Sequence, residues 1–199
     1  MDNSFVVYDL EILATVEEAG GWDQHHKMGI SVLCAYSSLT DRYLVFSDEM
    51  PDNWKVIYDA RPLSEFERLA QSAAFLVGFN SSRFDRKVCE AKGLTLPDRE
   101  YDLLIEGWKA QEVNLDGPYF KGTHGGGLQD YAQANLDVSK SLDGTLAPVM
   151  WRGGKIREVV EYCLLDVRIT RKLFELSQTR GWLDNPKTGR RVNFSKVEF

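Results

Sequence analysis

The chain alternates short apolar runs with longer segments in which apolar residues recur at helical spacing. Four runs rich in aromatic and β-branched residues predict strands, at positions 5–8, 28–36, 42–46 and 73–79. The polar stretch between the second and third runs predicts a hairpin turn. The pattern therefore predicts a sheet in which a hairpin lies beside the first strand.

Helical spacing marks the segments between and after these strands. Residues 63–73 predict a helix that leads into the fourth strand, and another helix is predicted to begin near Ser82. Residues 155–178 carry an apolar face and are followed by Gly181, a typical stop signal, so they predict a long and largely buried helix. Strands and helices in this order indicate an α/β protein.

Two carboxylates stand at the end of the first predicted strand. Side chains on a strand alternate between its faces, so Asp9 and Glu11 share one face while Leu10 takes the other. The two carboxylates would repel each other in an empty site, whereas a hard cation with oxygen ligands lets both stay ionised. Asp-x-Glu is also typical of a solvated turn, and both interpretations stay open at this point.

A third carboxylate follows the fourth predicted strand. Asp85 falls in the first turn of the helix predicted after Asn80, and its side chain is expected to face back toward the strand ends. The alternative is an aspartate that only complements the helix dipole, which contributes less than about 1 kcal/mol. Asn80 could likewise be only a turn residue.

A fourth carboxylate lies on the long helix. Tyr162 and Asp166 are four residues apart, so they share one face of that helix. The pair alone could be incidental. However, acidic residues among apolar neighbours are costly to bury unless a positive charge compensates them. Together, the acidic positions of all three segments predict a site for divalent metal ions.

These three segments resemble the exonuclease motifs of the DEDD, or DnaQ-like, superfamily. The resemblance rests on Asp9-Leu10-Glu11, on Asn80 with Phe84-Asp85, and on Tyr162 with Asp166, and it covers about residues 4–180. The tyrosine four positions before the last aspartate resembles the tyrosine (DEDDy) branch, which includes the exonuclease domains of family B DNA polymerases. The resemblance implies an α/β, ribonuclease H-like fold with a mixed sheet of about five strands flanked by helices.

The same resemblance implies a metal-dependent 3′→5′ exonuclease that acts on single-stranded nucleic-acid ends, with DNA favoured, and releases nucleoside 5′-monophosphates. It assigns two divalent cations, Mg²⁺ or Mn²⁺, to the four carboxylates. Asp9 would bridge both ions, Glu11 and Asp166 would complete one site, and Asp85 would hold the other, directly or through water. Tyr162 would position the attacking water, since a phenol with a reference pKa near 10 is a poor base at neutral pH. An exoribonuclease and a non-catalytic nucleic-acid-binding module stay open as alternatives.

Three residues are assigned to substrate binding. Asn80 and Phe84 belong to the second motif, and the ring of Phe84 could stack on a base. Lys155 precedes Asp166 by eleven positions and so returns to nearly the same helix face. It also lies near the expected helix start, where backbone N–H groups favour phosphate. We therefore expect Lys155 to contact the substrate backbone.

Three further features carry less specific signals. Asp102 follows a short apolar segment and is expected to cap a helix, with a place near the site as the alternative. The glycine-rich stretch 122–127 lacks the lysine of a phosphate-binding P-loop, so we expect a loop, which could lie at the substrate groove. Arg168 is expected to be a solvated charge on the face opposite Asp166.

Composition fits one intracellular domain. The 199 residues, 43% of them hydrophobic, suffice for a single exonuclease domain over 1–199, and no Pro- or Gly-rich linker divides them. No apolar run is long enough to span a bilayer and no secretion signal is recognisable, so we expect a cytoplasmic protein without a membrane partner. Cys34, Cys89 and Cys163 lack C-x-x-C spacing and are expected to be reduced core thiols.

Net charge is the least favourable feature for a nucleic-acid partner. A net charge of −6 does not favour binding of duplex nucleic acid over a broad surface, although cations bound at the site would offset part of this negative charge. Residues 181–199, together with Arg180, are locally basic and are expected to form a C-terminal tail. This tail could contact a phosphate backbone or could be only a solubilising end. The sequence identifies no polymerase, helicase or repair partner.

Overall fold

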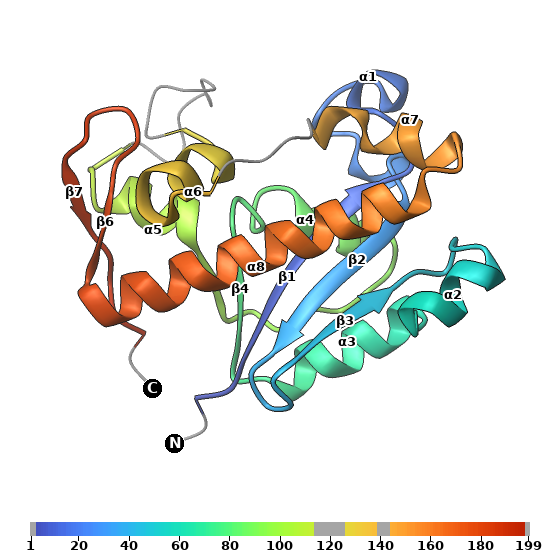
Figure 1. The fold of residues 1–199 in the computed structure, drawn as a ribbon, viewed down its shortest axis with the longest axis horizontal. Coiled ribbons are helices and arrows are strands. Elements are labelled where there is room, and N and C mark those ends of the chain that lie inside the picture. The colour runs from blue at the N-terminus through green and yellow to red at the C-terminus, as the bar shows by residue number, and fades with distance from the viewer. Residues whose placement is uncertain (1–2, 114–125, 139–143, 198–199) are drawn as a thin grey trace.

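The computed structural model describes residues 3–113, 126–138 and 144–197, and in these ranges a five-stranded sheet forms the centre (Figure 1). Its strands are β1 (Phe5–Ile12), β2 (Ile30–Ser37), β3 (Arg42–Phe46), β4 (Phe75–Gly78) and β5 (Glu100–Asp102). They lie in the order β3-β2-β1-β4-β5. The β1–β2 and β2–β3 pairs are antiparallel, whereas β1–β4 and β4–β5 are parallel. The sheet is therefore mixed, with β1 at its centre.

Helices cover both faces of this sheet. Those before β5 are α1 (Val16–Ala19), the 3₁₀ turn η1 (His25–Lys27), α2 (Asp52–Tyr58), α3 (Leu63–Ser72) and α4 (Asp85–Ala91). Those after it are α5 (Leu103–Lys109), α6 (Leu128–Leu136), the 3₁₀ turn η2 (Gly144–Leu146), α7 (Ala147–Arg152) and α8 (Ile156–Arg180). The long α8 crosses one face of the sheet obliquely (Figure 1). None of the helices in the described ranges is long and apolar enough to cross a membrane.

Two apolar cores lie on opposite faces of the sheet because alternate residues of β1 point to opposite sides. Val7 joins the core formed with α8, which includes Val160, Cys163 and Val167. Tyr8 and Leu10 join the other core, which α3 and α4 cover. All three cysteines are buried free thiols, as predicted. The central strand is thus anchored from both sides.

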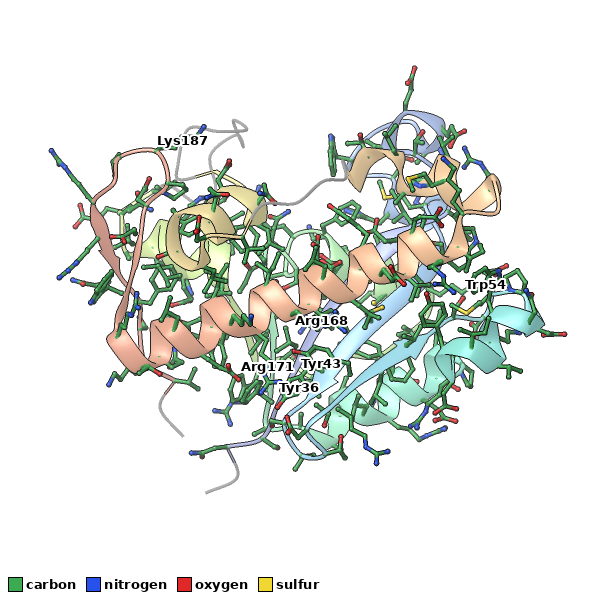
Figure 2. All side chains as sticks on the ribbon, in the orientation of Figure 1. Tyr36, Tyr43, Trp54, Arg168, Arg171 and Lys187 are labelled. Carbon is green, nitrogen blue, oxygen red and sulfur yellow. The ribbon has the colours of Figure 1, made fainter. Side chains whose placement is uncertain are left out.

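Two expectations about local structure need correction. The helix predicted to begin near Ser82 begins at Asp85, because the N–H and hydroxyl of Ser82 donate to Oδ2 of Asp102 instead of joining a helix. The segment expected to be a basic tail forms a hairpin of β6 (Trp182–Asp184) and β7 (Arg191–Asn193), with Lys187 in its turn (Figure 2). This hairpin packs on the α8 side because Leu183 and Val192 of its strands, and Phe194 directly after β7, are buried there.

Candidate active site

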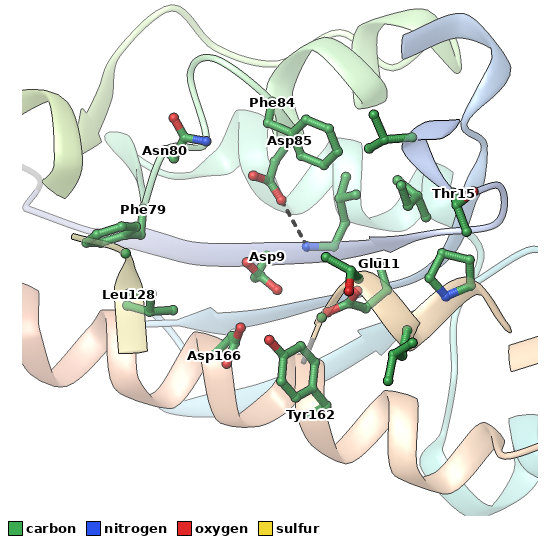
Figure 3. Close-up of a pocket in the computed structure, with 18 of the residues that line it drawn as sticks. Asp9, Glu11, Thr15, Phe79, Asn80, Phe84, Asp85, Leu128, Tyr162 and Asp166 are labelled. Carbon is green, nitrogen blue, oxygen red and sulfur yellow. Dashed lines mark hydrogen bonds between the residues drawn. The ribbon is translucent and has the colours of Figure 1, made fainter. Parts of the chain in front are cut away.

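One pocket of about 680 Å³ brings together segments that are far apart in the sequence. Its wall includes the end of β1, the turn between β4 and α4, the α1 segment, the η2–α7 segment and one face of α8. Figure 3 shows side chains of these segments pointing into a shared space. Seven predicted site residues line it: Asp9, Glu11, Asn80, Phe84, Asp85, Tyr162 and Asp166.

The strand β1 presents Asp9 and Glu11 on the same face, as its alternation predicts. The backbone of both residues is held by other elements. The thiol of Cys163 on α8 donates to the carbonyl oxygen of Asp9 at 3.4 Å, and the Ser31 hydroxyl donates to that of Glu11 at 2.9 Å. The β1–β2 register shifts just after Glu11. The backbone that carries the two carboxylates is therefore held in place at the end of β1.

Asp85 is the first residue of α4 and is only 5% exposed. Its Oδ1 accepts a hydrogen bond of 3.1 Å from the backbone N–H of Leu10, which lies between the two β1 carboxylates. The pKa of Asp85 is raised to about 8, mainly by burial and also by the negative charges of Glu100 and Asp102, against the lowering effect of the backbone hydrogen bonds. This carboxyl group is thus costly to ionise unless a cation compensates it.

The turn that delivers Asp85 is fixed by two acidic residues of β5. Asn80 has a left-handed backbone with φ of 61°, and its N–H donates to Oδ1 of Asp102 at 2.8 Å. Asp102 also caps α5, as predicted. Glu100 accepts from the Tyr8 hydroxyl at 2.8 Å, from the Ser81 hydroxyl at 2.6 Å and from Nε of Arg86 at 2.6 Å.

Sequence reasoning missed Glu100. Its neighbours in the sequence, Arg99 and Tyr101, gave no sign that its carboxylate would be buried. Its role follows from contacts with Tyr8 on β1, Ser81 in the turn after β4 and Arg86 on α4, all of which belong to other segments than β5. Glu100 therefore supports the site without lining the pocket.

The α8 helix contributes Tyr162 and Asp166, one turn apart. The Tyr162 hydroxyl hydrogen-bonds Asp166, and its pKa lies far above the ordinary tyrosine value. Burial is the main cause, followed by the negative charges of Asp166, Glu11 and Asp9. Carboxylates from β1 and α8 thus act on the same hydroxyl and disfavour its ionisation.

The donor chemistry of the pocket fits divalent cations. Carboxylate oxygens are the ligands that Mg²⁺ and Mn²⁺ prefer, and all four predicted carboxylate residues line this one pocket, together with Glu17. As the side chains lie, however, no three histidine, cysteine, aspartate or glutamate residues in the described ranges are arranged to hold one ion. Holding a metal would therefore require a different arrangement of these carboxylates.

Lys155 does not join the residues that line this pocket. It lies exposed at the N-terminal end of α8, and its backbone N–H already donates to the carbonyl of Met150 at 2.9 Å. Its contact with substrate stays a prediction. Arg168 is exposed on α8, as predicted, where its guanidinium lies 5.3 Å from the ring centroid of Tyr43 (Figure 2). Most of the glycine-rich stretch 122–127 lies outside the described residues.

Comparison with solved structures relates this fold to a polymerase. The family B DNA polymerase from the hyperthermophilic archaeon Pyrobaculum calidifontis matches with a TM-score of 0.58 and 20% sequence identity. The match covers 89% of this chain but 25% of that one, so the chain spans about a quarter of the length of the polymerase. The predicted fold class is confirmed. No protein-family profile matches the chain, and neither does any curated protein.

Proposed function

We propose that this protein is a metal-dependent 3′→5′ exonuclease of the DEDDy type, which hydrolyses phosphodiester bonds at single-stranded DNA ends and releases nucleoside 5′-monophosphates. One observation carries the proposal: Asp9, Glu11, Asp85, Tyr162 and Asp166, from three separate elements, line a single pocket. The direction of digestion rests on the resemblance of these positions to the exonuclease motifs. The fold shared with a DNA polymerase supports DNA as the substrate class.

The four carboxylates would hold two divalent cations. By the same resemblance, Asp9 would serve both ions, Glu11 and Asp166 would complete one site, and Asp85 would hold the other ion, directly or through water. When bound, such ions polarise a phosphoryl oxygen and lower the pKa of a bound water. The hydrogen bond from Leu10 to Asp85 and the network of Glu100 fix the α4 side of this ligand set.

Tyr162 would orient the attacking water and would not act as a base. Its pKa is raised well above the ordinary value, so the phenol keeps its proton and can donate a hydrogen bond. Its partner Asp166 holds the ring in place from one turn further along α8. The proposal extends to the nuclease reaction alone, since the chain spans only a quarter of the polymerase that it resembles.

The decisive experiment uses 5′-labelled DNA and RNA oligonucleotides of the same sequence, with Mg²⁺ or Mn²⁺ and with EDTA as the blank. We expect a ladder of 3′-shortened DNA products that Asp9→Asn and Asp166→Asn abolish. Asp52→Asn is the matched control, because the Asp52 side chain is 99% exposed and lies outside the pocket. A ladder on RNA alone would indicate the exoribonuclease. Binding without any shortening would indicate a non-catalytic module and would refute the proposal.

A further inference from the structure

The C-terminal hairpin concentrates positive charge on a protein whose net charge is −6. Residues 180–197 carry five basic side chains against one acidic side chain, that of Asp184. The basic residues are all exposed: Arg180, Lys187, Arg190, Arg191 and Lys196. None of them forms an ion pair with a carboxylate in the described ranges of the chain. Such a group of cations favours the binding of a polyanion.

Two of these cations share one aromatic ring. The guanidinium carbon of Arg191 lies 4.0 Å from the ring centroid of Trp182, and that of Arg180 lies 5.3 Å from it. The ring attracts each cation, whereas the two guanidinium groups repel each other. Arg191 is also the partner of Asp184 in the hairpin register, yet it lies over the ring and forms no ion pair with that carboxylate. An anion that binds both guanidinium groups would relieve their repulsion, and phosphate suits guanidinium geometry well.

The loop that joins β6 and β7 is fixed by Asn185, whose side chain is buried at 2% exposure. Its carboxamide oxygen accepts hydrogen bonds from the backbone N–H of Lys187 at 2.8 Å and of Thr188 at 3.1 Å. Its amide nitrogen donates to Oε1 of Gln111, just after α5, at 2.7 Å. Gly189 has a left-handed backbone with φ of 64°, which suits a tight turn. A fixed backbone thus carries Lys187 at the tip of the hairpin (Figure 2).

Two helices fix the position of the hairpin relative to the pocket (Figure 1). Leu128 at the start of α6 lines the pocket, and Asn135 near the end of α6 forms two hydrogen bonds with the backbone of Asp184, at 2.7 and 3.0 Å. On α8, Asp166 and Arg180 are about 21 Å apart at about 1.5 Å per residue. A DNA strand in helical conformation advances about 3.4 Å per nucleotide, so about six nucleotides span this distance.

We propose that the hairpin binds the phosphate backbone of the nucleic acid about six nucleotides from the 3′ end that enters the pocket. This inference rests on the proposed function, because the distance is counted from the carboxylates of the candidate active site. Contacts to phosphate carry no sequence information, so binding at the hairpin should not depend on the sequence of the strand. A strand that is shorter than this distance should not reach the hairpin.

Equilibrium binding tests the hairpin without any cleavage. Fluorescence anisotropy in EDTA gives the Kd of a single-stranded DNA oligonucleotide of twenty nucleotides as a function of salt. Each phosphate contact contributes about −0.7 to the slope of log K against log salt, so Arg190→Gln combined with Arg191→Gln should flatten the slope by about 1.4. Between 50 and 200 mM salt, the wild type should thus lose about 7-fold more affinity than this double variant.

The matched control combines Arg42→Gln with Arg68→Gln. Both arginines are exposed, they lie on β3 and α3, and their loss changes the net charge by the same amount. This control should keep the wild-type salt slope.

Kinetics with Mg²⁺ locates the contact along the strand. The hairpin double variant should raise KM for the twenty-nucleotide strand and leave KM for a four-nucleotide strand unchanged, because the short strand does not reach the hairpin. An equal rise in KM for both strands would place the effect in the pocket and would overturn the proposal.

The two proposals fail separately. If the wild type shortens DNA but the hairpin double variant keeps the wild-type salt slope, the hairpin contact is wrong and the nuclease stands. If nothing is shortened but the slope still depends on Arg190 and Arg191, the nuclease is wrong and nucleic-acid binding by the hairpin stands. If neither shortening nor this dependence is observed, both proposals fall. Displacement of the bound strand by polyglutamate at equal charge concentration would assign the hairpin to an acidic protein segment and would also overturn the inference.

Discussion

The backbone N–H of Leu10 donates a hydrogen bond of 3.1 Å to Oδ1 of Asp85. Leu10 lies between Asp9 and Glu11, so the strand that carries two of the candidate carboxylates also fixes the third through its own backbone. The relative position of these three groups depends on the pairing of β1 in the sheet centre and on the start of α4. The fourth candidate carboxylate, Asp166, is positioned by a different element, α8.

Divalent cations should stabilise the protein. A ligand that binds only the folded state at about 100 times its Kd adds about 2.7 kcal/mol, which corresponds to several degrees in Tm for a chain of this length. Mg²⁺ or Mn²⁺ should raise the Tm of the wild type and of Asp52→Asn, and much less that of Asp9→Asn. Differential scanning calorimetry measures this shift, and equal shifts in all three proteins would exclude Asp9 as a ligand.

Without metal, stability should fall as pH rises, because the folded-state pKa of Asp85 is about 8 against an ordinary value of 3.8. Between these values the unfolded chain gives up the Asp85 proton while the folded protein retains it. Raising the pH within this window therefore lowers the free energy of unfolding, and the effect ends above the folded-state pKa. In EDTA, the Tm of Asp85→Asn should decrease less between pH 5 and pH 8 than the Tm of the wild type. Parallel Tm profiles would contradict this assignment.

Tyr162→Phe should reduce kcat and leave the fold intact. The substitution removes the hydroxyl that hydrogen-bonds Asp166, a proposed metal ligand. Loss of such a partner costs about 10- to 100-fold in activity. Steady-state kinetics on single-stranded DNA gives the value, with Tyr58→Phe outside the pocket as the control. Because the phenol keeps its proton, the pH–rate profiles of wild type and variant should have the same shape.

Gly144→Ala should reproduce much of the Tyr162→Phe defect. A Cβ atom at Gly144 would lie 2.9 Å from the Tyr162 hydroxyl oxygen, so the ring must move. The expected result is a roughly 10-fold lower kcat, since the displaced ring keeps its hydroxyl but holds it less well against Asp166. Gly127→Ala is the matched control, because a Cβ atom there meets nothing within 4 Å although Gly127 lines the same pocket. Equal activity of the two variants would contradict the role of Gly144.

Glu100→Gln should destabilise the protein although Glu100 does not line the pocket. Its side chain is 5% exposed and pairs with Arg86, which is 14% exposed. Neutralising one partner of a buried ion pair costs about 3 kcal/mol. Urea unfolding measures the loss. Glu65→Gln is the control: its ion pair with Arg61 is partly exposed, so its loss should change stability by less than about 1 kcal/mol.

The sequence predicted the parts of the site that depend on local periodicity. Alternation placed Asp9 and Glu11 on one face of β1, and helical spacing placed Tyr162 and Asp166 one turn apart. It did not predict the role of Glu100, because that role depends on contacts with Tyr8, 92 positions away, that no local pattern encodes.

The C-terminal hairpin and Trp22 were missed for related reasons. The strands β6 and β7 have three residues each, too few for a period of two to be recognised. Trp22 lies in a glycine turn outside any motif, and only the fold shows that it shares a pocket with Phe84. Local patterns thus located the carboxylates, whereas tertiary contacts decided what surrounds them.

The α8 helix buries residues along its whole length, from Ile156 to Ser177, and carries Tyr162 and Asp166 within that span. It shares its apolar core with β1 and with the C-terminal hairpin. Such a helix cannot detach on its own, because its departure would open the whole apolar core on its face of the sheet. Heating should therefore not release α8 from a protein that otherwise stays folded. Loss of activity through release of α8 should coincide with cooperative unfolding of the protein.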